Sequence, residues 1–198
     1  MLKVGITGNI GSGKTTVSKV FELLGVPVFY ADDAAKNIMV TDALLMQQIK
    51  EAFGAESYFD DGSLNRKHIA GIVFNDQQQL DKLNSLTHPA VFRAFDNWVS
   101  KIENVPYVMK EAALLFESAS FQMCDKTIMV TAPIDLRVKR VIQRDNISEA
   151  EIKSRDARQF DEAKKVNMAD YVIKNDESLL VIPQVLKLHN EFLKLASK

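Results

Sequence analysis

The segment GNIGSGKT at residues 8–15 decides the fold of this chain. It matches the pattern G-x-x-x-x-G-K-[ST] of a phosphate-binding loop, in which backbone amides enclose the phosphates of a nucleotide and the hydroxyl binds Mg²⁺. The apolar run Val4-Gly5-Ile6 precedes it, and a helix-forming run over residues 16–24 follows. Strand, loop and helix are the context that the motif requires. We therefore predict that a nucleoside triphosphate binds at Gly11, Ser12, Gly13, Lys14, Thr15 and Thr16.

The composition is that of an ordinary globular domain. The chain has 198 residues, of which 46% are hydrophobic and 26% charged, and its net charge of −1 predicts no general attraction to nucleic acid or membrane. The single cysteine, Cys124, excludes an internal disulfide and suits a reducing cytosol. No signal pattern opens the sequence, and no apolar run reaches the roughly 18 residues that span a bilayer. We expect a cytoplasmic protein.

The apolar runs predict an α/β fold. Strand patterns alternate with helical ones, so we expect a parallel sheet of about five strands flanked by helices. The strands are expected over residues 3–7, 26–30, 107–111, 126–131 and 170–173. Between the second and third strands the spacing of apolar residues is mainly helical. The prediction is one domain, 1–198, with a nucleotide-binding core (1–33, 103–135 and 166–198), a helical substrate-binding insertion (34–102) and a lid (136–165).

Carboxylates follow two of the predicted strands, where parallel sheets bind their ligands. Asp32 ends the second strand and could deprotonate an acceptor hydroxyl, although an Asp there could also cap the next helix, a role that Asp33 fits better. Glu111 ends the third strand, where a magnesium-associated acid is common. Glu117 adds a second acid downstream, and either glutamate could be a plain surface charge.

His88 precedes Pro89, which we expect to start a new helix. A lone histidine is more often structural than catalytic. Five of the seven arginines fall within 22 residues. They could form a lid whose positive charge closes over the transferring phosphoryl group, or a solvated, salt-bridged helical hairpin. We favour the lid, with one helical face carrying Arg137, Arg140 and Arg144 and, in a helix expected from Ser148 to about Lys165, another carrying Arg155, Arg158 and Gln159.

Taken together, these motifs resemble the dephospho-CoA kinase family. The phosphate-binding loop alone is shared by many nucleotide-binding proteins, whereas its combination with a His-Pro pair and a Leu-Leu-Phe-Glu string is far more specific. The match runs in order through nearly the whole chain. It is carried by residues 5–17, Leu24-Gly25, Ala31-Asp32, residues 61–66, Val73-Phe74, Leu86-Thr87-His88-Pro89, Leu114-Leu115-Phe116-Glu117, Arg155 to Gln159 and Ala169-Asp170.

The resemblance implies ATP-dependent phosphorylation of the ribose 3′-hydroxyl of dephospho-CoA, the last step of coenzyme A synthesis. It implies ATP and Mg²⁺ as cofactors, and Asp32, Lys14 and Arg140 as the catalytic residues. Thr15 and Glu111 would hold the metal. By the same resemblance, the acceptor side of the site would contain His88, Leu115, Phe116 and Glu117. The only partner expected is this small-molecule substrate, and we expect a monomer or weak oligomer.

The chain departs from the family pattern at three positions. The family usually has Asp where Tyr30 and Glu111 stand here, and Pro where Ala113 stands. Two other functions remain possible from the motifs alone: another small-molecule kinase, such as one acting on a nucleoside monophosphate, and a slow GTP-hydrolysing switch. The sequence lacks an Asn-Lys-x-Asp string for reading guanine, which argues against the switch.

Overall fold

A five-stranded parallel sheet forms the centre of the nucleotide-binding part of the chain. The computed structural model describes residues 1–74 and 76–197. The sheet order is β2-β3-β1-β4-β5, and every neighbouring pair is parallel. The α/β fold class predicted from the strand and helix patterns is confirmed. The strands are β1 (Leu2–Thr7), β2 (Val28–Tyr30), β3 (Tyr107–Glu111), β4 (Lys126–Thr131) and β5 (Tyr171–Lys174).

The chain divides into two compact units, each with its own core. The first unit is Met1–Tyr30 with Ile102–Lys198, and the second is Ala31–Lys101. The helices of the first unit are α1 (Lys14–Leu23), η2 (Ser120–Met123), α6 (Ile134–Asp145), α7 (Glu149–Asp156), α8 (Glu162–Met168) and α9 (Val181–Ala196). Those of the second are α2 (Ala31–Thr41), α3 (Ala43–Phe53), η1 (Ala55–Ser57), α4 (Arg66–Val73) and α5 (Gln77–Val99).

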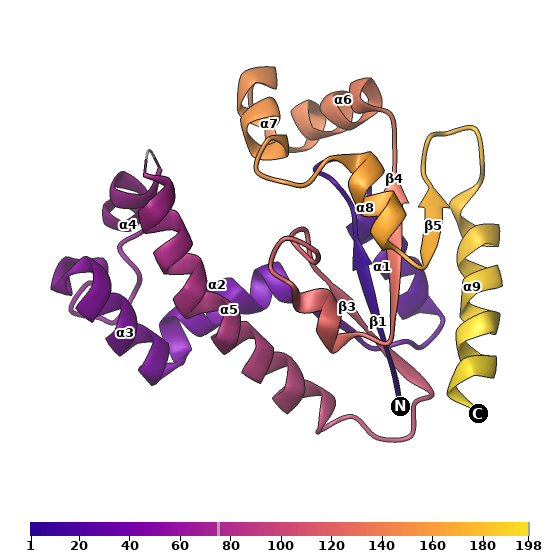
Figure 1. Ribbon diagram of the computed structural model, residues 1–198, viewed down its shortest axis with the longest axis horizontal. Coiled ribbons are helices and arrows are strands. Elements are labelled where there is room, and N and C mark those ends of the chain that lie inside the picture. Colours follow the sequence, from indigo (N-terminus) through magenta and orange to yellow (C-terminus); the bar gives the residue numbers. More distant parts are fainter. Residues whose placement is uncertain (75, 198) are drawn as a thin grey trace. The chain divides into compact units, whose positions relative to one another are not determined.

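The sheet of the first unit is covered by helices on both faces. In Figure 1, α1 lies behind the strands and α8 in front of them. Helices α1 and α9 share one core with the central strands, in which Phe21 and Phe192 are fully buried beside Ile6. Because the central strands are covered on both faces, they consist of nearly continuous apolar residues, as is usual in parallel sheets. The sheet therefore provides a rigid base for the loops at its carboxyl edge.

The second unit is a helical assembly around a separate apolar cluster. Leu45 and Ile49 of α3 are fully buried in it, with Ala90 of α5 and Ile69 of α4. An isolated antiparallel bridge between Tyr58 and Leu64 interrupts the helices. Across the described parts of both units, no helix is long and apolar enough to cross a membrane.

Pro89 does not start a helix, contrary to the sequence prediction. It lies inside the continuous 23-residue helix α5. Proline in a helix removes one backbone hydrogen bond and costs about 3 kcal/mol. Helix α5 tolerates this cost because it buries Thr87, Ala90, Val91 and Phe95 along its length. Tertiary packing thus outweighs the tendency of proline to break a helix.

Three further local predictions were wrong. Helix α2 begins at Ala31, so Asp33 lies in the first helical turn rather than at the cap. Strand β2 begins at Val28 instead of Val26, whose amide donates to Phe21 O at the end of α1. The helix expected over residues 148–165 is two helices, α7 and α8, separated by residues 157–161. In this break the backbone amide of Phe160 donates to Glu117 instead of to the preceding turn, and the side chain of Gln159 bonds to the backbone of two other segments.

Candidate active site

The phosphate-binding loop connects β1 to α1, and two of its glycines have backbone conformations that favour glycine. Gly11 has φ +80° and Gly13 has φ +88°, the left-handed region that side chains rarely adopt. A Cβ at Gly11 would also collide with the backbone of Arg137, and one at Gly13 with the side chain of Asn175. Helix α1 begins immediately afterwards at Lys14. Its first amides have no intrahelical partners, so the loop and helix together suit an anion.

Lys14, Thr15 and Glu111 are adjacent at the carboxyl edge of the sheet. Lys14 Nζ lies 3.3 Å from Glu111 Oε1, and Thr15 Oγ1 donates to Glu111 Oε2 at 3.4 Å. Glu111 ends β3, where it pairs in register with Ile6 of β1 and Tyr30 of β2. Its side chain is 7% exposed. A hydroxyl beside a buried carboxylate provides the hard oxygen ligands that Mg²⁺ prefers, so these residues fit that metal.

The first half of the loop is fixed by other parts of the protein. Ile10 N donates to Gln159 Oε1 at 2.8 Å, and Ile10 O accepts from Arg137 Nη1 at 3.3 Å. The buried Asn9 donates through Nδ2 to Asp156 Oδ1 and to Phe160 O, both at 3.2 Å. The second half has a further contact, because Asn175 Nδ2 donates to Ser12 O at 2.8 Å.

The arginines predicted to form one cluster have different environments. Arg137 is 5% exposed and makes an ion pair of 2.7 Å with Asp156, so it is part of the interior. Arg140 donates to Asn175 O at 3.0 Å and pairs with Glu177 at 3.3 Å. Arg144 pairs with the next residue, Asp145. Arg155 lies in the last turn of α7, whereas Arg158 and Gln159 lie in the break after it, so the three do not share a helical face.

The Leu-Leu-Phe-Glu string follows β3 and is largely buried. Leu115 is fully buried beneath β1, where a Cβ at Gly5 would lie 2.8 Å from its Cδ2. Phe116 is 3% exposed, and its ring lies 5.5 Å from that of Phe121. Glu117 Oε1 accepts from Phe160 N at 2.7 Å.

A buried ion pair joins Glu117 to Lys165, a residue that the sequence did not single out. Lys165 Nζ lies 2.8 Å from Glu117 Oε1 and donates to Ala113 O at 3.1 Å, and its side chain is fully buried. Burial lowers the pKa of the Lys165 ammonium, against the opposing effect of Glu117. Lys164 precedes it in the same short helix and is exposed. Nothing in one sequence distinguishes the two lysines.

Asp32 and His88 belong to the second unit. Asp32 lies exposed in the first turn of α2, two residues after the end of β2. Its neighbour Asp33 forms an exposed ion pair of 2.7 Å with Lys36. His88 is half-buried on α5, with its ring stacked on that of Phe92 at 6.4 Å between centroids.

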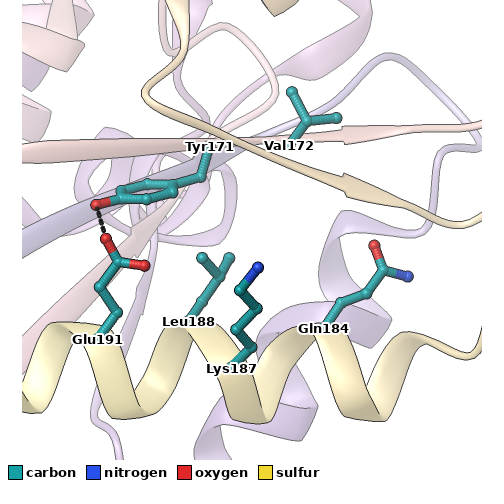
Figure 2. A pocket seen from close by; sticks show the side chains of 6 residues that line it. All are labelled: Tyr171, Val172, Gln184, Lys187, Leu188 and Glu191. Carbon is teal, nitrogen blue, oxygen red and sulfur yellow. Dashed lines mark hydrogen bonds between the residues drawn. The ribbon is translucent and has the colours of Figure 1, made fainter.

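A shallow pocket of about 340 Å³ lies away from the phosphate-binding loop. Figure 2 shows it between β5 and α9, with Tyr171 and Glu191 joined by a hydrogen bond of 2.7 Å. Its other lining residues are Val172, Gln184, Lys187 and Leu188. Gln184 hydrogen-bonds the backbone of Lys174, so its side-chain amide serves the end of β5.

Comparisons with known proteins identify the family. The family model described as dephospho-CoA kinase matches residues 2–180. The dephospho-CoA kinase of Salinibacter ruber is 40% identical over 181 residues, covering 90% of this chain and 91% of that protein. The enzyme of the same name from Bacteroides fragilis strain YCH46 is 37% identical over 187 residues, covering 94% and 91%.

Solved structures agree with the sequence matches. TT1252 from Thermus thermophilus superposes with a TM-score of 0.84 at 33% identity, covering 96% of both chains. The dephospho-CoA kinase from Campylobacter jejuni gives 0.71 at 28% identity, covering 97% of both. A shikimate kinase from Bacteroides thetaiotaomicron, 17% identical with a TM-score of 0.50, shares the fold alone. Matches to almost the full chain, in both sequence and structure, show that this protein belongs to the dephospho-CoA kinase family.

Proposed function

We propose that this chain transfers the γ-phosphoryl group of ATP to the ribose 3′-hydroxyl of dephospho-CoA, giving coenzyme A and ADP. The observation that carries the proposal is the contact of Lys14 and Thr15 with the buried Glu111 at the start of α1. A cation, a hydroxyl and an acid in this arrangement suit a magnesium-bound triphosphate. Family membership supplies the acceptor.

The nucleotide would bind along residues Gly11 to Thr16. Amides at the start of α1 would donate to its phosphate oxygens, and Lys14 would contact the outer phosphates. Thr15 and Glu111 would hold Mg²⁺, which when bound neutralises charge on the β- and γ-phosphates. Arg140 would add positive charge beside the transferring group.

Asp32 is proposed as the general base. Its carboxylate would accept the proton of the ribose hydroxyl as that oxygen attacks the γ-phosphorus in line. The bond between the γ-phosphorus and the β,γ-bridging oxygen then breaks, and ADP leaves. Two arguments support this assignment: by the resemblance, Asp32 stands where the family has its catalytic base, and its side chain is exposed.

The remaining predicted residues are proposed for the acceptor side. His88 would contact dephospho-CoA from the helical insertion, residues 34–102. Leu115 and Phe116 are buried, and Glu117 is paired with Lys165, so we propose that they support this side of the site from within. Residues 136–165 are proposed as the lid. We also propose that the enzyme is cytoplasmic, since its single cysteine suits a reducing compartment. We propose that it is a monomer or weak oligomer.

A coupled ADP-release assay with ATP and Mg²⁺ tests the function. Dephospho-CoA is offered beside AMP, CMP and adenosine, and product masses are measured. We expect the mass of one added phosphate on dephospho-CoA alone. Turnover of AMP or CMP instead would replace the acceptor while keeping a kinase. ATP binding without transfer to any acceptor would contradict the proposal. Lys14→Ala is the negative control, because it removes the cation that contacts the phosphates.

A further inference from the structure

Gln159 joins the phosphate-binding loop to the end of β3 through both ends of its side-chain amide. Gln159 Oε1 accepts from Ile10 N at 2.8 Å, and Gln159 Nε2 donates to Ala113 O at 3.1 Å. Ile10 is the third residue of the loop, and Ala113 lies two residues beyond Glu111. One half-buried side chain therefore fixes the distance between the loop and the strand that carries the proposed metal-binding acid.

The Ala113 carbonyl is a shared acceptor at this junction. Besides Gln159, it accepts from Lys165 Nζ at 3.1 Å and from Thr7 Oγ1 at 3.3 Å. These donors come from the break between α7 and α8, from α8 and from the end of β1. Lys165 in turn is held by Glu117. The position of Ala113 O is therefore determined from three directions, which makes it a firm anchor for Gln159.

The arrangement divides the loop into two halves with different tasks. The side-chain amide of Asn9 donates to Asp156 and Phe160. Ile10 N donates to Gln159 and Ile10 O accepts from Arg137, so these groups of the first half bond to protein. Gly11 begins the second half, and the backbone amides at the start of α1 are the ones that suit phosphate. A small displacement of the first half would be transmitted directly to the second. Misplacement of a reacting group by about 1 Å can cost on the order of 10²-fold in rate.

We propose that Gln159 is a positioning residue for nucleotide binding. It holds Ile10 at a fixed distance from Ala113, so that Lys14 and Thr15 contact the phosphates beside Glu111. The inference rests on the proposed function in one respect, namely that this loop binds ATP, and it does not depend on the identity of the acceptor. It also divides the proposed lid: residues 156–165 and Arg137 are fixed to the loop and its surroundings, so closure is confined to the other residues of the lid.

A purely structural role is the alternative, and the chain contains a matched control for it. Gln184 is also half-buried and also uses both ends of its amide on backbone groups. Its Oε1 accepts from Lys174 N at 2.9 Å, and its Nε2 donates to Lys174 O at 2.9 Å. Figure 2 shows Gln184 extending from α9 towards the strand above it. Its Nε2 also donates to Leu180 O at 3.1 Å, so Gln159→Met removes two side-chain hydrogen bonds to the backbone and Gln184→Met removes three, at two different places.

The test compares these two variants with the wild type. For each protein the melting temperature is measured first. The Kd of a non-hydrolysable ATP analogue with Mg²⁺, kcat, KM for ATP and KM for dephospho-CoA are then measured well below it. We expect similar losses of melting temperature in both variants. Gln159→Met alone should weaken the analogue about 10-fold or more and lower kcat/KM for ATP by about 10- to 100-fold. KM for dephospho-CoA should stay within about 2-fold in both.

The proposal is overturned if Gln159→Met retains wild-type nucleotide affinity and kcat, or if Gln184→Met loses them equally. Should Gln159→Met fail to fold, Gln159→Asn takes its place: the amide is kept but shortened by one methylene, so it cannot hold Ile10 and Ala113 together. We expect the same selective loss, of smaller size. If the wild type binds the analogue but does not phosphorylate dephospho-CoA, the acceptor assignment fails while the Kd comparison still decides the role of Gln159.

Discussion

The carboxylate of Glu111 contacts both residues that end the phosphate-binding motif: Oε1 lies 3.3 Å from Lys14 Nζ, and Oε2 accepts from Thr15 Oγ1 at 3.4 Å. If ATP binds as proposed, its outer phosphates would compete with this glutamate for Lys14. The family pattern has the shorter Asp at this position. The additional methylene of Glu111 still allows contact with both residues.

Glu111→Gln should separate nucleotide affinity from metal dependence. Without a competing charge beside Lys14, ATP in the presence of EDTA should bind at least as tightly as to the wild type. The Mg²⁺ concentration for half-maximal rate should rise about 10-fold or more, because a charged oxygen ligand is lost. Calorimetry and a Mg²⁺ titration of the rate measure the two effects. Glu149→Gln, which disrupts an exposed pair with Lys153, is the control; weaker metal-free ATP binding by Glu111→Gln would contradict this account.

Asp32→Asn should impair chemistry without impairing nucleotide binding. An amide cannot accept the proton of the ribose hydroxyl, so kcat should fall about 10²- to 10⁴-fold while the Kd of ATP stays within about 2-fold. The adjacent Asp33→Asn is the matched control, because Asp33 is also exposed in the same turn and pairs with Lys36. It should retain wild-type turnover. Steady-state rates and ATP titrations of the two variants decide the assignment, and wild-type kcat in Asp32→Asn would reject it.

The sequence predicted the elements whose signals are local. The strands, the loop and the helix that follows it were predicted from apolar runs and glycine spacing, and strand-end reasoning correctly singled out Glu111 as a neighbour of the loop. Local reasoning failed where distant segments decide the outcome. Pro89 stays inside α5 because of packing, and the break at residues 157–161 exists because Gln159 and Phe160 bond to the loop and to Glu117.

The polar network around Ala113 was beyond the reach of one sequence for the same reason. Lys165 is 52 residues from the carbonyl that it binds, and Gln159 is 149 residues from Ile10. No periodicity or motif connects such pairs. The arginines led to a different error, because their proximity in sequence was taken to predict a single cluster. Arg137 is buried against Asp156, whereas Arg144 pairs with its own neighbour on the surface.

Lys165→Met should destabilise the protein strongly. It leaves the buried carboxylate of Glu117 without its cation, and a broken buried pair costs about 3–5 kcal/mol in the free energy of unfolding. Adding Glu117→Gln should recover part of the loss, because the double variant buries no unpaired charge. Urea denaturation of both single variants and the double variant gives the coupling energy. The exposed pair of Glu149 and Lys153 serves as control and should couple far more weakly, because solvent screens its charges. Equal coupling in the two pairs would contradict the expectation.

Asp170 should make stability depend on pH in the acid range. Its carboxylate accepts from Thr127 N and Thr127 Oγ1, both at 2.8 Å, and pairs with Lys126 at 3.2 Å. Partial burial acts to raise the pKa of Asp170, but these hydrogen bonds and the lysine outweigh it and hold the pKa below its usual 3.8. The unfolded chain therefore binds this proton more readily than the folded one. Stability from the carboxylate is complete well above pH 3.8 and is lost as the pH falls through the lower folded value.

Asp170→Asn removes this contribution at every pH. Near pH 7 the variant should be less stable than the wild type by about 1 kcal/mol, less than a fully buried hydrogen bond to a charged group contributes, because solvent screens the partly exposed carboxylate. The difference should shrink steadily as the pH is lowered from about 5 towards 3, because the wild-type carboxyl becomes protonated and then resembles the amide in charge. Urea denaturation of both proteins at matched pH values measures the difference directly. A gap that stays constant across this range would mean that the charge of Asp170 is not what joins β4 to the start of β5.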